Sequence, residues 1–262
     1  MRCAVLAAAL AALASSAPAS AGWGITADME HFRWAEDTEP RVTETGPRFG
    51  VGVSWTQDRP WGWQFAYRGR LYFGSVKYDG TTLFPPHQPI TGTTEYGGLI
   101  NEGQAIYRFP GNASGAEFVS GLAWDYWNRQ LSSDQREQYW VASVRLGLNL
   151  DRRASTGWFG GAGLKYPFYT HEDGHLTEIG FTSNPTLQPR GDVSLYAQAG
   201  YRFSRNWSLT GYYDSYRFKE SDPTPVVVNP SAPPTSACRT GCRLVQPTSN
   251  VDSFGLRLQY SF

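Results

Sequence analysis

The last ten residues of the chain alternate between apolar and polar side chains, and this pattern restricts the fold more than any other feature. One parity carries Phe254, Leu256, Leu258, Tyr260 and Phe262, and the other carries Ser253, Gly255, Arg257, Gln259 and Ser261. Successive side chains of a β-strand point to opposite faces, so such a strand has one apolar and one polar face. A helix would mix the two sets on one stripe. The sequence therefore predicts a strand that ends at Phe262.

The same period of two recurs in nine segments upstream, which makes ten predicted strands in all. Their apolar residues fall within 23–29, 49–55, 65–73, 105–109, 118–126, 140–150, 158–168, 193–203, 207–213 and 254–262. Strands that face lipid on one side and the inside of a closed barrel on the other have this alternation. We expect seven acids and seven bases to point inward as an ion-pair network: Asp28, Glu30, Arg68, Arg70, Glu102, Arg108, Glu117, Asp125, Arg145, Lys165, Asp192, Arg202, Asp214 and Arg257.

The connections between these segments alternate in length. Short turns are predicted at 57–61, 110–115, 151–156 and 204–206, and longer loops at 36–46, 78–94, 128–138, 171–191 and 220–249. The sequence thus predicts an all-β fold, a ten-stranded antiparallel up-and-down transmembrane β-barrel with short periplasmic turns and five longer extracellular loops. A soluble β-sandwich is the competing fold, but it does not account for long loops on one side only.

The N-terminal residues have the pattern of an export signal, with Arg2, an apolar stretch over 4–13 and small residues up to Ala21. We expect residues 1–21 to be a cleaved signal peptide and residues 22–262 to form one barrel domain. Together with the strands, this predicts a multi-pass protein of the bacterial outer membrane. The 23 basic and 23 acidic residues leave no basic surplus, so no nucleic-acid partner is expected.

Two cysteines, Cys238 and Cys242, lie close together in a proline-rich segment of the last loop. An exported chain favours a disulfide between them. A zinc site would need two further ligands, and no histidine lies nearby, so no metal is expected. The prolines of this loop argue against regular strand pairing there.

The predicted number of strands also bears on the interior. Barrels of about eight strands are filled by side chains, whereas those of sixteen or more leave a channel. We therefore expect a filled interior and no general diffusion pore, with a narrow channel as an alternative. The leading hypothesis is a non-enzymatic barrel without cofactors, whose outer loops meet lipopolysaccharide or an unidentified external partner.

Ten strands, five outer loops and the residues Tyr166, His171, Asp173, His175, Tyr196, Gly200, Tyr201 and Trp207 resemble the omptin family of outer-membrane proteases. In that family an Asp-x-His pair at the fourth outer loop helps to activate a water, and two aspartates in the second loop complete the site. The resemblance implies catalytic roles for Asp173 and His175, with Asp79 as the one acid in place of the second pair. An aspartate can hold an imidazole in the tautomer that accepts a proton.

The terminal Phe262, with Tyr260, resembles the aromatic signal by which the barrel assembly machinery recognises its clients. This resemblance implies that the machinery is a partner during biogenesis. Outer-membrane lipid and lipopolysaccharide are the other expected partners.

Overall fold

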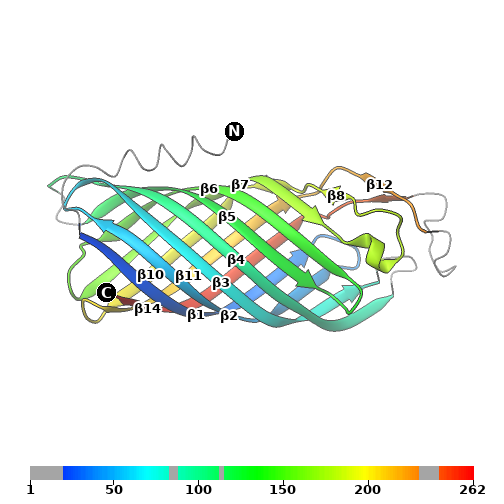
Figure 1. Ribbon diagram of the computed structural model, residues 1–262, viewed down its shortest axis with the longest axis horizontal. Coiled ribbons are helices and arrows are strands. Elements are labelled where there is room, and N and C mark those ends of the chain that lie inside the picture. Colours follow the sequence, from blue (N-terminus) through cyan, green and yellow to red (C-terminus); the bar gives the residue numbers. More distant parts are fainter. Residues whose placement is uncertain (1–19, 83–87, 112–114, 230–241) are drawn as a thin grey trace.

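The computed structural model describes residues 20–82, 88–111, 115–229 and 242–262, and its dominant feature is a closed antiparallel barrel (Figure 1). The ten strands that form the wall are β1 (Ser20–Glu36), β2 (Val42–Asp58), β3 (Gly62–Thr81), β4 (Pro89–Arg108), β5 (Ala116–Gln130), β6 (Arg136–Asp151), β7 (Gly157–Asp173), β10 (Ser194–Arg202), β11 (Trp207–Lys219) and β14 (Ser249–Ser261). The predicted fold class and strand number are confirmed. No helix in the described ranges is long and apolar enough to cross a membrane.

Each wall strand pairs with the next wall strand along the chain, including β7 with β10 from Gly157 to Lys165, and the pairing of β1 with β14 closes the ring. The Phe262 N–H donates to the Trp23 carbonyl (2.9 Å), so the beginning of β1 and the end of β14 meet at the end of the barrel that carries the short turns. We call this the turn end and the opposite one the loop end. Closure satisfies the backbone groups that an open edge would expose to lipid.

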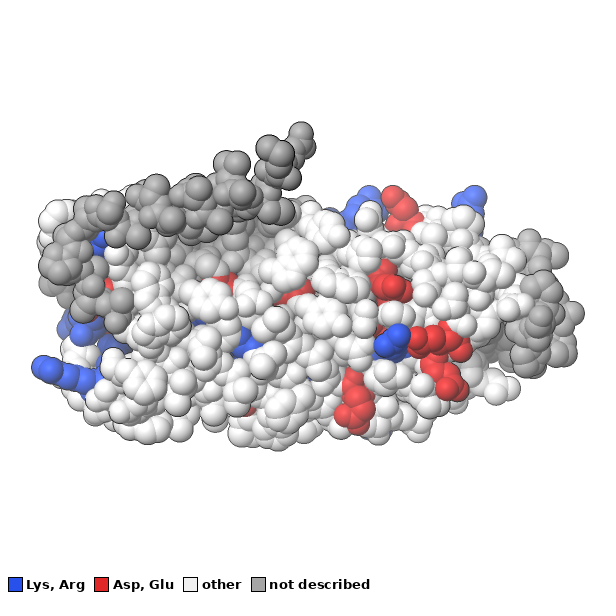
Figure 2. Space-filling view, in the orientation of Figure 1, with Lys and Arg blue, Asp and Glu red and all other residues white. Residues whose placement is uncertain are grey.

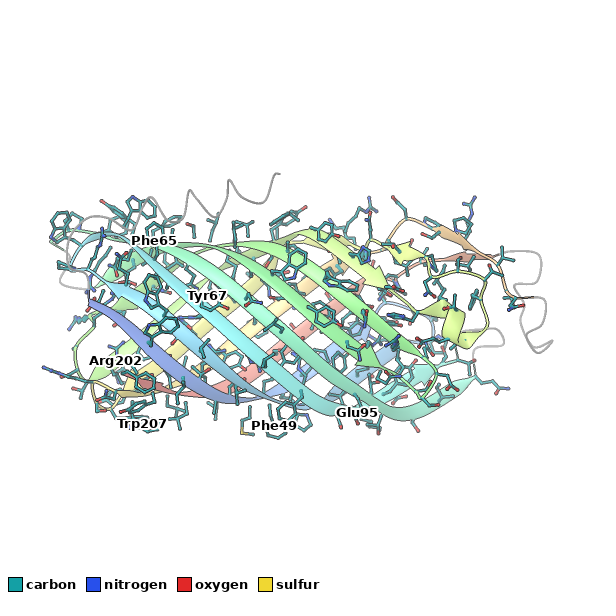
Figure 3. All side chains as sticks on the ribbon, in the orientation of Figure 1. Phe49, Phe65, Tyr67, Glu95, Arg202 and Trp207 are labelled. Carbon is teal, nitrogen blue, oxygen red and sulfur yellow. The ribbon has the colours of Figure 1, made fainter. Side chains whose placement is uncertain are left out.

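Outward side chains form an apolar band around the turn-end half of the wall. Its members include Trp23, Met29, Phe49, Leu71, Phe73, Leu122, Leu148, Trp158, Leu164, Trp207 and Phe254, all exposed. The wall is almost free of visible charge over this stretch, whereas charged side chains gather over the loop end (Figure 2). The aromatic residues Phe49, Tyr67 and Trp207 lie on this outer face (Figure 3). The predicted parity of the strands is therefore correct.

The strands continue beyond the apolar band, and there their outer face becomes polar. On β1 the outward residues after Met29 are His31 and Arg33, and on β3 those after Phe73 are Ser75 and Lys77. Because the apolar residues of this part lie on the inward parity instead, the outward apolar pattern stops and the predicted loops 36–46 and 78–94 were too long; β2 begins at Val42 and β3 runs to Thr81. We call this part the extension.

A β-bulge in β7 changes which residues point outward in the extension. The register between β6 and β7 shifts between Ala142 and Ser143, so that Phe168 and Tyr169 are both exposed. Pro167, at the bulge, has no N–H to contribute to a ladder. Beyond the bulge Glu172 is buried and Asp173 lies on the outer side.

The fourth and fifth loops at the loop end pack on each other. Leu176 and Phe181 of the fourth share a small apolar core with Val226 and Val228 of the fifth. Within the fifth loop, β12 (Thr224–Val226) pairs with β13 (Cys242–Leu244), so the expectation that prolines exclude pairing was wrong. The described fourth-loop elements are a 3-10 helix η1 (Leu176–Ile179) and two short strands, β8 (Thr186–Leu187) and β9 (Arg190–Asp192).

Two predictions fall partly outside the described residues. Of the predicted signal peptide at 1–21, only Ser20 and Ala21 are described, as the first two residues of β1, so its cleavage stays a prediction. Cys238 is not among the described residues, and for Cys242 only the backbone is described, so the disulfide stays a prediction.

Candidate functional site: the lumen and the loop end

A layer of aromatic and aliphatic side chains fills the lumen in the extension. Trp34 of β1 touches Tyr139 of β6 with ring centroids 5.5 Å apart. These two strands are five positions apart in a ring of ten and so lie opposite each other. We call the whole cluster the aromatic layer: Phe32, Trp34, Tyr72, Val76, Tyr96, Trp127, Tyr139, Val141, Phe218 and Val251. It crosses the full width of the barrel.

Arg129 lies beside this layer at the centre of four glutamates. It contacts Glu44 at 2.9 Å, Glu137 at 2.6 Å and Glu36 at 3.4 Å. The Arg129 guanidinium also lies 5.0 Å from the Trp34 ring centroid, as in a cation–π contact. The fourth glutamate, Glu172, is buried nearby, where Glu137 repels it and Arg129 attracts it. One guanidinium cannot neutralise four carboxylates.

The surplus of acid changes the proton affinity of two of these groups, which lie in the extension beyond the apolar band. Burial, together with the charge of Glu137, raises the pKa of Glu172 well above its ordinary value. Burial also raises the pKa of Glu36, against the attraction of Arg129. The carboxyls of Glu36 and Glu172 therefore bind their protons more tightly than exposed carboxyls do.

Toward the turn end the lumen contains ion pairs, with tyrosine rings such as those of Tyr196 and Tyr212 against the arginines. Arg145 bridges Glu102 at 2.8 Å and Asp214 at 3.1 Å, and Lys165 bonds Asp214 at 2.6 Å. A second group joins Arg70 to Asp28 and Arg48 to Glu30. Buried charges are retained at low cost only when paired in this way.

Most of the predicted inward charges belong to such pairs; among the described residues Arg68 and Asp125 do not, and Asp192 does not face the lumen. Asp192 is an outer-face residue of β9, where it pairs with Lys219 at 3.1 Å and both side chains are exposed. The prediction that Asp192 points inward is therefore wrong. The chain between β7 and β10 leaves the wall there, which the alternation does not reveal.

A cavity of about 140 Å³ lies in the lumen between these ion pairs and the aromatic layer. Trp34, Tyr96 and Trp127 line its loop-end side, and Thr26 and Gln259 line it toward the turn end. The lumen is therefore filled by side chains at the loop end and contains a cavity lower down.

The predicted pair Asp173 and His175 does come together at the loop end. The backbone N–H of His175 donates to Asp173 Oδ1 at 2.9 Å. The imidazole Nε2, however, lies 4.0 Å from Asp173 Oδ2, beyond hydrogen-bond reach. His175 has a left-handed backbone (φ 45°) and its Nδ1 lies 3.8 Å from Glu178, which Arg136 already binds at 2.7 Å. In this arrangement Asp173 fixes the turn more than it orients the imidazole.

Asp79, the third predicted catalytic residue, lies elsewhere. It is exposed on β3, on the outward parity of Leu71 and Lys77, and β3 is four strands from β7 in the ring. No hydrogen bond or ion pair within the described ranges joins it to Asp173 or His175. The structure therefore brings two of the three predicted residues together, and the protease hypothesis stays a prediction.

Sequence reasoning missed the Arg129 cluster. Its members Glu36, Glu44, Arg129 and Glu137 continue the inward parity of their strands into segments that were assigned to loops or to their edges. Extending the period of two past the apolar band would have found these four. Glu172 could not be found in this way, because the bulge reverses the parity of β7.

No protein-family model and no curated protein sequence matches the chain. Among solved structures, the transport unit of the autotransporter AIDA-I from Escherichia coli is 13% identical, with 95% of this chain and 92% of that chain covered and a TM-score of 0.42. The translocator domain of NalP from Neisseria meningitidis is 9% identical, with 99% and 94% covered and a TM-score of 0.40. The toluene transporter TodX from P. putida is 9% identical, with 94% and 90% covered and a TM-score of 0.32.

At these scores the likenesses carry no conclusion about function. The assignment of class rests on the chain itself: a closed ring of ten antiparallel strands, an apolar outer band and a charged interior. These features define a β-barrel of the outer-membrane type.

Proposed function

We propose that this chain is an outer-membrane barrel that does not conduct solutes and acts through its folded loop end. The Trp34–Tyr139 contact between opposite strands carries the proposal. A ring contact across the diameter obstructs the lumen, and Trp127 extends it by stacking on Tyr139 at 5.0 Å and meeting Tyr216 of β11 at 6.0 Å. Loops that pack on one another above this layer form an ordered surface for recognition.

Planar-bilayer recording tests the closed lumen. The refolded protein is expected to give no steady conductance, and the double variant Trp34→Ala/Tyr139→Ala is expected to conduct, because it removes the contact across the lumen. Trp140→Ala is the matched control, since Trp140 follows Tyr139 on β6 but faces outward. Steady conductance of the unaltered protein would refute the proposal and revive the narrow-channel alternative.

Lipopolysaccharide is the proposed associated lipid. Exposed Arg33 and Lys77 flank Thr45 in one row on the outer wall, because Arg33 pairs with Thr45 and Thr45 with Lys77. This row lies just beyond Met29 and Phe49, where lipid phosphates are expected to lie.

Removing both charges in Arg33→Gln/Lys77→Gln should reduce retention of lipopolysaccharide during purification. Arg205→Gln, at an exposed turn-end residue, should leave retention unchanged. Equal retention in all three proteins would count against this row as the contact.

We also propose that the barrel assembly machinery recognises the terminal strand through Tyr260 and Phe262. Phe262 is 72% exposed, and its ring contacts that of Tyr260 at 5.2 Å. Deleting Phe262 should lower the amount of barrel in the membrane severalfold. Deletion of an exposed loop-end residue outside the strands, such as Ser133, should not, and normal levels without Phe262 would contradict the role.

A further inference from the structure

Two arginines that face the lumen cavity make no hydrogen bond to any residue that the structure describes. Arg68 has no acceptor within hydrogen-bond or ion-pair distance among the described residues, although Glu102 is its direct partner in the strand register. Arg257 approaches Asp28 only to 3.8 Å and otherwise lies over the Tyr212 ring at 4.7 Å. Both guanidinium groups therefore have free donors directed toward the cavity.

The neighbouring carboxylates are occupied by other cations. Glu102 accepts from Arg145 at 2.8 Å and from Gln104 at 2.7 Å. Asp28 accepts from Arg70 through Oδ1, whereas its Oδ2 accepts no hydrogen bond among the described residues and lies 3.8 Å from Arg257. Arg68 thus lies beside an acid that is already engaged, and Arg257 is held only loosely by Asp28.

The charge around the cavity favours an anion. Five arginines and four carboxylates line it, and Arg68 is attracted by Glu102 and repelled by Arg145 and Arg257. One of the four carboxylates, Asp125, lies beside the cation Lys165. In the strand register Asp125 is opposite Ile100, which lies two residues closer to the aromatic layer than Glu102, the partner of Arg68. An unpaired guanidinium in a confined space offers planar, two-pronged donors that suit carboxylate or phosphate.

The surroundings of the two arginines add neutral hydrogen-bond groups. Thr26, Ser54 and Gln259 line the cavity toward the turn end, and the aromatic layer closes it toward the loop end. A cavity of about 140 Å³ has room for several waters, at about 30 Å³ for each water in the liquid, or for one small oxyanion with some water.

We propose that this cavity is a binding site for a small oxyanion, a phosphate or a carboxylate, held by Arg68 and Arg257 and entered from the turn end. The site is separate from the loop end and does not depend on the recognition role proposed for it. A dead-end pocket of this kind would bind its ligand without passing it through the barrel.

Isothermal titration of the refolded full chain with inorganic phosphate, and separately with acetate, tests the site. We expect saturable binding of at least one of the two anions at one per barrel, and a loss of tenfold or more in affinity in Arg68→Gln. Arg68→Lys should be intermediate, because it keeps the charge but loses the planar fork. Arg205→Gln, with its exposed arginine, should bind as the unaltered protein does. Stronger binding of phosphate than of acetate, or the reverse, identifies the class of oxyanion.

The unaltered protein provides a second measurement that needs no variant. At constant ionic strength, the better of the two anions should raise the midpoint of thermal unfolding relative to chloride, because a ligand of the folded state stabilises it. Arg257→Gln should lessen this rise if Arg68→Gln does not fold. Absence of saturable binding and of a rise for both anions, or unchanged binding in the folded Arg68→Gln, would overturn the proposal.

Discussion

The two levels of the barrel have opposite distributions of polarity. Within the apolar band the outer face carries residues such as Leu71 and Leu256, and the lumen carries ion pairs such as Arg145–Asp214. In the extension the outer face carries Lys77 and its polar neighbours, and the lumen carries the aromatic layer. The strands and their pairings are continuous through both levels.

This difference reflects the solvent on the outside. In lipid an apolar outer face has no cost, so the interior need not supply a hydrophobic core. Beyond the band water surrounds the wall, and the barrel is stabilised as a soluble protein is, by burying apolar surface inside. The same substitution should therefore have different consequences at the two levels.

The largest loss of unfolding free energy is expected when a core residue of the extension is truncated. Trp34 is 1% exposed, and Trp34→Ala should lower the free energy of unfolding by about 3–5 kcal/mol, as for other buried aromatic residues. Arg33→Ala, one residue earlier and outward, should change it little. Urea unfolding in lipid vesicles, followed by tryptophan fluorescence, measures both. Equal losses would mean that the layer is not a core.

The second-largest difference between the two levels is expected when a charged residue is placed on the outer face. Leu71→Arg lies within the band and should cost about 2–4 kcal/mol of unfolding free energy near the bilayer centre. Ser75→Arg, four residues further on the same face of β3, should be close to neutral because it lies opposite Glu95. The same vesicle titration compares them. If Ser75→Arg lowers the free energy of unfolding as much as Leu71→Arg does, the apolar band extends beyond Phe73.

A smaller, pH-dependent effect is expected at Glu172 in the extension. Burial first, and then Glu137, raises its pKa above the ordinary 4.5 in the folded state. Below pH 4.5 both states hold the proton and no penalty arises; as pH rises above that value the unfolded chain ionises and folding becomes less favourable.

The isosteric variant Glu172→Gln removes this penalty. It should therefore stabilise the barrel at pH 8, by an amount on the order of 1 kcal/mol, and change nothing at pH 4. Glu178→Gln is the matched control, since Glu178 is an exposed acid of the same loop region. A gain at pH 4 that matches the gain at pH 8 would exclude ionisation as the cause.

The sequence predicted the apolar band of the barrel better than it predicted the extension. Within the band the alternation Phe254 to Phe262 and its nine counterparts were enough for strand number, parity and closure, because outward residues that face lipid are mostly apolar. In the extension no such requirement holds, so residues 42–46 of β2 and 78–81 of β3 were assigned to loops. The bulge at Phe168 depends on long-range pairing with Ala142 and Ser143, which no local pattern of β7 contains.

The smallest effect is expected for the pair that the omptin resemblance singled out. Since Asp173 lies beyond hydrogen-bond reach of the His175 imidazole and Asp79 lies four strands away, we expect no cleavage of short peptides with basic pairs by protein refolded with lipopolysaccharide. Mass spectrometry of the peptides measures this, with His175→Ala as the comparison. Cleavage that is lost in His175→Ala would show that the rim rearranges to join Asp173, His175 and a further acid, and the extension would then have to be regarded as a mobile catalytic wall instead of a fixed core.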